Sequence, residues 1–299
     1  MPPKAKAPDF GSQDYWDQRF TKDTKPFDWL SAPEALDPLI TGALRRANED
    51  EPRILHIGCG SSLLSRHLRK YVKYPPRQLH HVDYSKVVIK AEAVREMVEF
   101  NGVCVACAIW SAVDLLDYKS VVENCDWRPY SLIVDKSTSD AISCAEDVVC
   151  QLPYAVTTRF VSPGDNLVEI EPKEISVHPL QILAVHLALV TKPGARWIAL
   201  SYTAERYPFL EGEATETEDD GTSHTGIPDP RLLWTVVDKQ QIEAKEEVSG
   251  GGVTHRPKVY HWVYILQRTS IPLFTSYVRP EEDTEEDSDE DADSDSGQD

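Results

Sequence analysis

No run of apolar residues in this sequence is long enough to cross a membrane. The longest, ILAVHLALV at Ile182–Val190, contains His186, and a spanning helix needs about 20 apolar residues. The first residues, MPPKAKAPDF, lack the apolar core of a signal peptide. We therefore expect a soluble, cytoplasmic protein that does not bind membranes.

The chain also lacks a cluster of lysine and arginine residues that could hold a phosphate backbone. Its formal net charge is −19, and Glu281–Asp299 contains only acidic charges. An acidic protein is a poor candidate for direct nucleic-acid binding. Because the tail has no apolar periodicity, we predict a disordered segment over residues 280–299, which either keeps the protein soluble or docks a basic partner.

Cysteine is present, but its pattern fits neither a disulfide framework nor a metal site. The six cysteines are scattered along the chain, as expected for reduced thiols. Only CVAC, at residues 104–107, has the spacing of a metal or redox pair, and no second pair or histidine cluster completes it. We interpret these cysteines as small buried thiols and predict no metal.

Segments that fit strands alternate with segments that fit helices along most of the chain. The pattern predicts helices over 14–20, 36–46, 63–71, 86–100 and 182–190, and strands over 53–57, 79–82, 109–113, 130–134 and 196–202. Such alternation is typical of an α/β domain with a doubly wound, mostly parallel sheet. Two further strands, 232–237 and 259–267, would complete seven strands as an antiparallel pair.

Two stretches are longer than such a sheet requires. Residues 143–178 exceed a simple crossover, and residues 211–257 contain long polar and irregular segments. We predict a flexible N-terminus over residues 1–13 and one domain over residues 14–279 that carries these two insertions.

A glycine turn follows the first strong strand, in RILHIGCGSSLLSRHLRK at residues 53–70. Gly58 and Gly60 would let backbone N–H groups approach an anionic ligand at a helix N-terminus. No Gly-Lys-Ser/Thr follows, which excludes a Walker loop. The third glycine of a dinucleotide site would fall at Leu63 and is missing. Its absence disfavours a dinucleotide, but both a dinucleotide and S-adenosylmethionine stay open here.

Acidic residues follow three of the predicted strands. Asp83 could hold ribose hydroxyls in either cofactor, and Asp114 could bind an adenine amino group. Asp135 would lie where a reacting group sits, since ligands bind beyond the carboxyl ends of strands in open α/β sheets. Together with the antiparallel ending, this order suits a methyltransferase better than a dehydrogenase.

Six motifs occur in an order that resembles one known family. They are DYWDQRF, PFDWL, ILHIGCGSSLLS, VDYSKVVI, VDLLDY and VDKSTSDAI. They are similar to motifs of the class I, Rossmann-like methyltransferases that use S-adenosylmethionine to modify lysine on translation elongation factor 1A. The similarity covers residues 14–142 and continues more loosely through 180–268.

The resemblance implies roles for individual residues around S-adenosylmethionine. Trp16, Phe20 and Trp29 would enclose the cofactor, and Gly58 would lie under its methionine part. Asp83 and Tyr84 would contact the ribose and the adenine. Asp114 and Leu115 would contact the adenine edge, and Lys136 would line the site near the methionine end. This sequence departs from the family pattern in having Phe20 for tyrosine and Ser137 for glycine.

The strand-end position of Asp135 makes it our candidate catalytic residue, orienting an incoming ammonium group. It is no strong general base, because a carboxylate beside an ammonium raises the pKa of that ammonium. The first hypothesis for function is a protein-lysine methyltransferase acting on a basic, elongation factor 1A-like protein.

Three alternatives stay open. The altered position Ser137 allows a methyltransferase-like binding module that keeps the fold. The substrate could instead be a protein N-terminus or a small molecule. A nicotinamide oxidoreductase is the least favoured, because the third glycine is missing.

Overall fold

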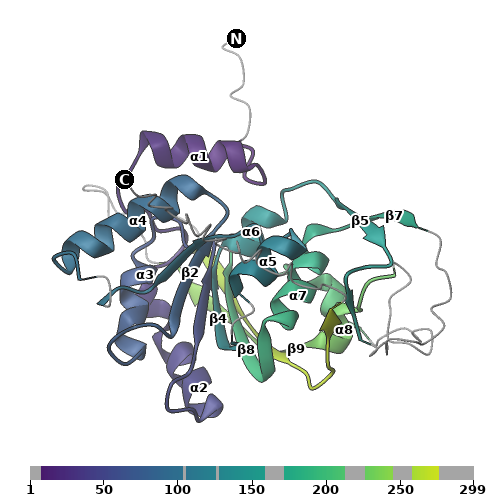
Figure 1. Ribbon diagram of the computed structural model, residues 1–299. Coiled ribbons are helices and arrows are strands. Elements are labelled where there is room, and N and C mark those ends of the chain that lie inside the picture. Colours follow the sequence, from purple (N-terminus) through teal and green to yellow (C-terminus); the bar gives the residue numbers. More distant parts are fainter. Residues whose placement is uncertain are drawn as a thin grey trace, which may run out of the picture.

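A seven-stranded sheet lies at the centre of the part of the chain that this computed structural model describes, residues 8–103, 106–125, 128–158, 172–212, 226–244 and 258–275. Helices lie on both of its sides (Figure 1). The strands are β1 (Ile54–Ile57), β2 (Leu79–Asp83), β3 (Ile109–Ala112), β4 (Tyr130–Lys136), β8 (Thr191–Ser201), β9 (Trp234–Glu243) and β10 (Tyr260–Arg268).

The strand order is β3-β2-β1-β4-β8-β10-β9. The first five strands run parallel, and β10 is antiparallel to both β8 and β9. This arrangement confirms the predicted doubly wound sheet with an antiparallel ending. Because the chain leaves β1 toward β2 on one side and reaches β4 on the other, a crevice opens at the carboxyl ends of β1 and β4, where ligands bind in such folds.

The five segments predicted as helices are helical, and the described part of the chain has three further helices, over 118–125, 138–142 and 230–233, that were not predicted. The helices are α1 (Gln13–Lys22), α2 (Asp37–Ala47), α3 (Leu64–His67), α4 (Lys86–Glu99), α5 (Tyr118–Cys125), α6 (Thr138–Ile142), α7 (Pro179–Leu189) and α8 (Pro230–Leu233), with 3₁₀ turns η1 (Pro33–Leu36), η2 (Leu68–Tyr71) and η4 (Pro208–Leu210). The single helix predicted over residues 63–71 is divided into α3 and η2.

Two strand boundaries also differ from the prediction. Strand β8 begins at Thr191 rather than Arg196, so it is longer at its start than predicted. Strand β9 begins at Trp234, because Pro230 starts the short helix α8 and Asp229 caps it by accepting from the N–H of Arg231 at 2.9 Å.

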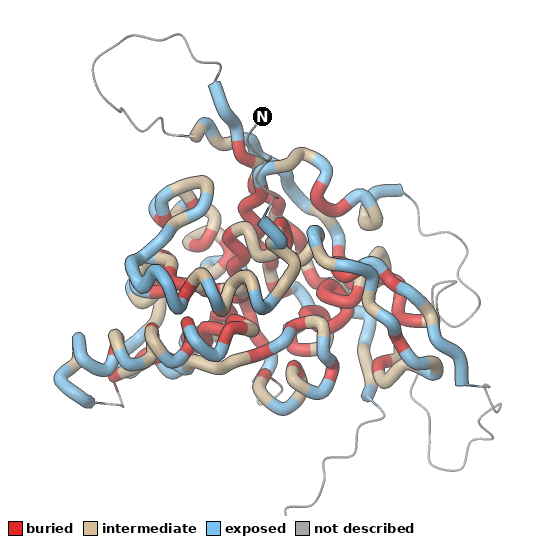
Figure 2. Tube along the Cα trace, turned by 90° about the horizontal axis from the view of Figure 1, so that it is seen from above, coloured by how far each residue is buried: buried red, intermediate tan, exposed pale blue. Residues whose placement is uncertain are grey.

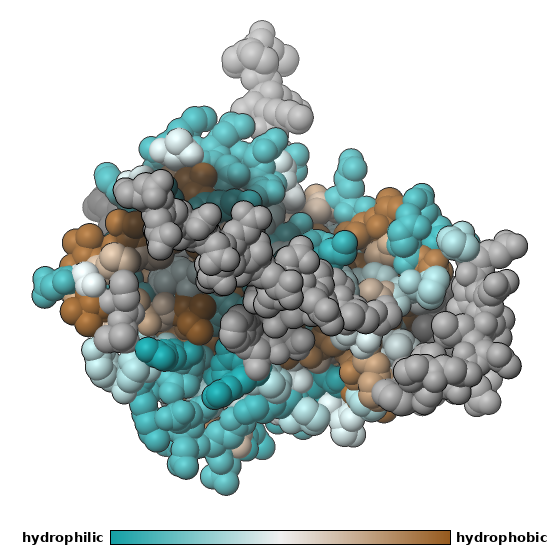
Figure 3. Space-filling view, in the orientation of Figure 1, coloured by the Kyte–Doolittle hydropathy of each residue, from teal (hydrophilic) through white to brown (hydrophobic). Residues whose placement is uncertain are grey.

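Apolar layers cover both faces of the sheet, and the buried residues gather along its centre (Figure 2). One layer includes α7, most of whose residues are buried, and the other includes Ile40 and Ala43 of α2. The outward surface over α2 is mainly hydrophilic (Figure 3), as expected for a helix with one apolar face.

The predicted insertion over residues 143–178 contains regular structure. Strands β5 (Val148–Leu152) and β7 (Lys173–Val177) form an antiparallel pair, and β6 (Val156–Thr157) pairs with β11 (Phe274–Thr275). Cys150 and Val177 pack with Ile182 of α7. This segment is therefore joined to the main core.

Several predictions fall on residues outside the described ranges. These are the acidic tail, Cys104 of the CVAC motif, and most of the polar stretch over residues 211–257. No helix among the described residues combines the length and the apolar character needed to cross a membrane.

Candidate cofactor pocket

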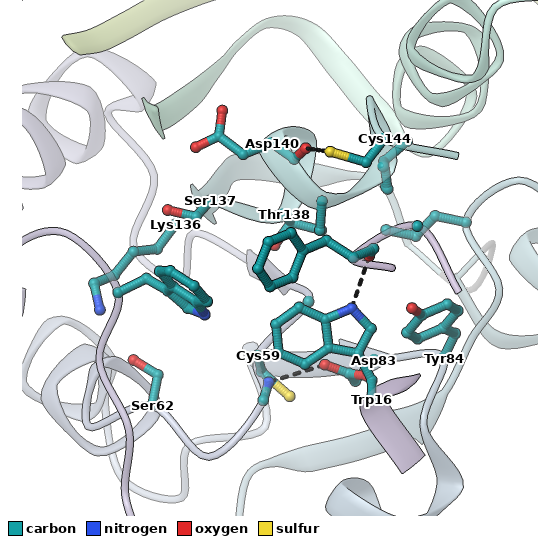
Figure 4. A pocket seen from close by; sticks show the side chains of 18 of the residues that line it. Trp16, Cys59, Ser62, Asp83, Tyr84, Lys136, Ser137, Thr138, Asp140 and Cys144 are labelled. Carbon is teal, nitrogen blue, oxygen red and sulfur yellow. Dashed lines mark hydrogen bonds between the residues drawn. The ribbon is translucent and has the colours of Figure 1, made fainter. Parts of the chain in front are cut away.

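A cavity of about 410 Å³ lies at the crevice between β1 and β4 (Figure 4). Its walls come from segments far apart in the sequence, between Phe10 and Tyr202. Ten predicted site residues line it: Trp16, Phe20, Trp29, Gly58, Gly60, Asp83, Tyr84, Asp114, Leu115 and Lys136. Asp135 is not among the lining residues.

The glycine turn after β1 has a backbone that requires glycine. Gly58 and Gly60 have φ angles of +51° and +49°. A Cβ atom on Gly58 would lie 2.2 Å from Oγ1 of Thr138, and that hydroxyl donates to the carbonyl of Ile57 at 2.9 Å. Gly58 therefore lets the ends of β1 and β4 approach each other.

Asp83 holds this turn in place and presents a buried carboxylate to the cavity. Its oxygens accept from the N–H of Gly60 at 2.9 Å and of Ser85 at 2.9 Å. Burial raises the pKa of Asp83 to about 6, against the lowering effect of these two bonds. Each carboxylate oxygen can accept a second hydrogen bond, so the group can still hold a ribose diol.

Aromatic side chains cover one side of the cavity. Trp16 and Phe20 stack on α1 with centroids 5.7 Å apart. The indole Nε1 of Trp16 donates to the carbonyl of Phe10 at 2.8 Å (Figure 4), and the rings of Phe10 and Trp29 meet edge to face at 5.6 Å. Aromatic faces of this kind attract cations such as a sulfonium.

Lys136 is held by an acidic residue from the loop after α1. Its Nζ donates to Oδ1 of Asp28 at 2.6 Å, and Ser62 Oγ donates to the same oxygen at 2.5 Å. The Lys136 side chain is only 3% exposed. Burial lowers the pKa of Lys136, and Asp28 partly opposes this effect.

Replacing Asp28 by asparagine is expected to lower the free energy of unfolding by about 2 kcal/mol, because it leaves the buried Lys136 ammonium without its counter-ion. Urea unfolding of Asp28→Asn measures this loss. In the background of Lys136→Met, Asp28→Asn should cost much less. An equal cost in both backgrounds would show that the pair does not couple.

The loop after β3 forms the opposite wall. Asp114 accepts from the N–H of Leu116 at 2.9 Å, and its own N–H donates to Ser120 Oγ at 3.0 Å. The carbonyl of Leu115 is bonded to Nδ1 of His186 at 2.7 Å. Tyr84 also lines the cavity, and burial raises the pKa of its hydroxyl.

The structure does not bring Asp135 into the cavity, against the prediction. One carboxylate oxygen accepts from the N–H of Thr138 at 2.9 Å and of Ser139 at 3.3 Å. The other accepts from Ser139 Oγ and from Nε1 of Trp197. Asp135 is fully buried. It fixes the start of α6 and is not exposed to the cavity.

Other polar residues occupy the end of the cavity beside β4 and β8. Asp140 forms an ion pair with Arg206 at 2.8 Å and accepts from the N–H of Tyr202 at 3.2 Å. The Tyr202 side chain is exposed at the rim. Ser137 has a φ of +69°, and its buried Oγ has no hydrogen-bond partner in the described part of the chain.

Comparisons with known proteins agree with this geometry. The chain is 36% identical over 160 residues to Methyltransferase srdJ of Neurospora crassa, covering 52% of this chain and 64% of that protein. It is 30% identical over 199 residues to EEF1A lysine methyltransferase 4 of Mus musculus, covering 65% of this chain and 66% of that protein. The chain thus spans just under two thirds of the length of these curated relatives. No family model matches it.

The order and directions of the seven strands, together with these relatives, decide the fold. The chain has the class I methyltransferase fold. Among solved structures, the N-methyltransferase NodS from Bradyrhizobium japonicum WM9, in complex with S-adenosyl-L-homocysteine, is 15% identical, with a TM-score of 0.39 over 87% of this chain and 94% of that one.

Sequence reasoning missed several residues that line the pocket of this methyltransferase fold or support it. Phe10 and Gly11 line it, although they fall in the N-terminus predicted as flexible. Asp28 could have been identified from the sequence, because it is the acidic residue of the PFDWL motif. Tyr202 is the last residue of the predicted strand 196–202, whereas β8 ends at Ser201, so Tyr202 follows a strand end as Asp83 and Asp114 were predicted to do.

Proposed function

We propose that this chain is a methyltransferase that uses S-adenosylmethionine. The observation that carries the proposal is the meeting of Asp83, Asp114 and the Trp16 ring around one cavity at the strand-order reversal. S-adenosylmethionine offers a diol, an adenine amino group and a sulfonium, which suit these three groups. The curated relatives named above are methyltransferases.

When bound, this cofactor supplies a methyl group that passes in line to a nucleophile. The new bond to the methyl carbon forms as the carbon–sulfur bond breaks, and its electron pair stays on sulfur. The chain's own residues orient the two reactants and exclude water. Trp16, Phe20 and Phe10 line the cavity and would exclude water from it. The ion pair with Asp28 fixes Lys136, which also lines the cavity.

We further propose that the nucleophile is a lysine amine on a basic protein similar to elongation factor 1A. The six sequence motifs and the similarity to EEF1A lysine methyltransferase 4 support this substrate. A net charge of −19 favours encounters with a basic protein. A lysine has a pKa of about 10.4, so it must lose a proton to water before it attacks.

Ser137 takes the place of Asp135 as the group that we expect to meet the amine. Ser137 lines the cavity, and its Oγ is buried without a hydrogen-bond partner in the described part of the chain, so the hydroxyl would have to rotate toward the cavity before it accepts from an amine N–H. Its positive φ keeps the backbone that a glycine would give at this position. The departure from the family motif therefore changes the side chain at a backbone conformation that glycine adopts readily, which supports the enzyme over a binding module.

The cofactor proposal is tested by calorimetry with S-adenosylhomocysteine on the wild type, Asp114→Asn and Asp117→Asn. In Asp114→Asn the amide oxygen can still accept from Leu116 N–H, and the amide NH₂ then opposes the adenine amino group. We expect about tenfold weaker binding, the value of one hydrogen bond. Asp117 accepts from Ser120 N–H in the same loop but does not line the cavity, so its variant should bind within about twofold of wild type.

Transfer of a labelled methyl group to proteins of a cell lysate tests the substrate. Labelling of a basic protein on lysine supports the proposal. Cofactor binding without any labelled product would favour a binding module, and labelling of a small metabolite or a protein N-terminus would replace the proposed substrate. Failure of the wild type to bind S-adenosylhomocysteine would refute the enzyme.

A further inference from the structure

A chain of hydrogen bonds joins the insertion to the wall of the cavity. Tyr154 lies between β5 and β6, His186 lies on α7, and Leu115 lies in the loop after β3. The Tyr154 hydroxyl is 2.6 Å from Nε2 of His186, and Nδ1 of His186 is 2.7 Å from the carbonyl oxygen of Leu115.

One arrangement of protons satisfies both bonds. A carbonyl oxygen can only accept, so Nδ1 of His186 carries a proton and donates it to Leu115. Burial lowers the pKa of His186 to about 4, so the ring is neutral near pH 7. Its Nε2 must then be an acceptor, and the Tyr154 hydroxyl donates to it. The hydroxyl thereby selects the tautomer that holds the loop.

This bond acts on a peptide group beside the expected adenine edge. The carbonyl of Leu115 is held by His186, and the N–H of the same peptide, on Leu116, is held by Asp114 at 2.9 Å. That peptide is therefore fixed at both ends. No acceptor for the Leu115 N–H is found in the part of the chain that the structure describes, which leaves this donor for a ring nitrogen of adenine.

Packing supports the same connection. The rings of Tyr154 and His186 are nearly parallel, with an interplanar angle of 11° and centroids 6.2 Å apart. Ile182, one turn before His186 on α7, packs with Cys150 and Val177 of the β5–β7 pair. The insertion thus keeps Tyr154 in place against α7.

We propose that Tyr154 and His186 are positioning residues for the adenine end of the cofactor, so that the segment of β5 and β6 is part of the cofactor site. This inference rests on the proposed use of S-adenosylmethionine. It predicts that the hydrogen bonds from Tyr154 through His186 to Leu115 control how strongly the protein prefers adenine over another purine. A residue that only stabilises the fold would not change this preference.

The test compares Tyr154→Phe with Tyr130→Phe. Each variant removes one hydroxyl from a tyrosine–histidine bond, since the Tyr130 hydroxyl lies 2.5 Å from Nδ1 of His80. Neither Tyr130 nor His80 lines the cavity. Calorimetry would measure binding of S-adenosylhomocysteine and of its inosine analogue, in which the adenine amino group is replaced by an oxygen.

For Tyr154→Phe we expect about five- to tenfold weaker binding of S-adenosylhomocysteine and a smaller preference over the inosine analogue. Tyr130→Phe should keep both the affinity for S-adenosylhomocysteine and the preference over the inosine analogue. A second pair of variants serves if Tyr154→Phe does not fold. The amide N–H of His186→Asn can replace Nδ1–H as the donor to Leu115, so this variant should keep more of the preference for adenine than His186→Ala. Equal behaviour of the two tyrosine variants would overturn the inference, whereas absence of binding by the wild type would overturn the proposed function.

Discussion

Gly58→Ala is expected to lower the free energy of unfolding by about 2 to 5 kcal/mol. The new methyl group would lie 2.2 Å from Oγ1 and 2.5 Å from Cγ2 of Thr138. Overpacking in a buried site costs about 1–3 kcal/mol. The φ of +51° adds about 1–2 kcal/mol for any residue with a Cβ. Urea unfolding followed by circular dichroism measures the loss.

Gly42→Ala is the matched control for this substitution. Gly42 lies in α2, and no atom lies within 4 Å of the position of its added Cβ. Alanine in a helix interior is favoured over glycine by about 0.5–1 kcal/mol, so this variant should be more stable than the wild type.

A double variant identifies the cause of the Gly58→Ala effect. Thr138→Ala removes the two atoms that lie closest to the added methyl group. In that background, Gly58→Ala should cost about 1 kcal/mol less than in the wild type. The same cost in both backgrounds would show that the contact with Thr138 is not the reason that glycine is needed.

The sequence predicted the strands and the glycine turn because their signals are local. An apolar strand, two glycines and a following helix lie within residues 53–70, and Asp83 ends the next apolar segment. For Gly58, however, sequence reasoning gave ligand approach as the cause. Thr138 begins α6, beyond the end of β4, so this contact could not be inferred from the neighbours of Gly58 in the sequence.

The misplacement of Asp135 has a simple geometric origin. The predicted strand ended at Val134, whereas β4 continues to Lys136. Successive side chains of a strand point to opposite faces. Lys136 lines the cavity, so Asp135 points the other way, toward Ser139 and Trp197. A difference of two residues at a strand end thus reversed the role of this carboxylate.

The remaining partners depend on contacts that no local pattern encodes. Asp28 and Lys136 are 108 residues apart in sequence, and His186 and Leu115 are 71 apart. His186 was visible only as a polar residue within an apolar helix. Its function in the fold depends on which backbone carbonyl the loop after β3 brings to it.

Five histidines are buried in the described part of the chain, and the four with the largest pKa shifts make stability at acid pH a second large effect. Burial lowers the pKa of His56 to about 3, of His80 and His186 to about 4, and of His81 well below its usual value. Lys136 adds to the lowering at His56. An unfolded histidine has a pKa near 6.5. The stability that these neutral histidines contribute is therefore present above pH 6.5 and is lost as the pH falls toward 4.

Buried carboxyl groups act in the opposite direction: burial raises the pKa of Glu92 and Asp140, and the largest shifts are those of Asp83 and Asp135. Burial raises the pKa of Asp83 and of Asp135 to about 6, from an unfolded value of 3.8. A raised pKa means that the folded state takes up protons first, so these groups add stability as the pH falls from 6 to 4. Near pH 5 the unfolded chain carries close to four more protons than the folded chain on these four histidines, and the folded chain carries close to two more on Asp83 and Asp135.

The unfolded state should thus bind about two more protons than the folded state, and the free energy of unfolding should fall by about 3 kcal/mol for each unit of pH below 6. Urea unfolding at pH 7, 6 and 5 measures this slope. His81→Phe keeps an aromatic ring 4.3 Å from that of Trp110 and removes one titrating group. Its slope should be smaller by about 1.4 kcal/mol per pH unit. Stability that stays constant or rises on acidification would mean that these histidines are protonated in the folded protein.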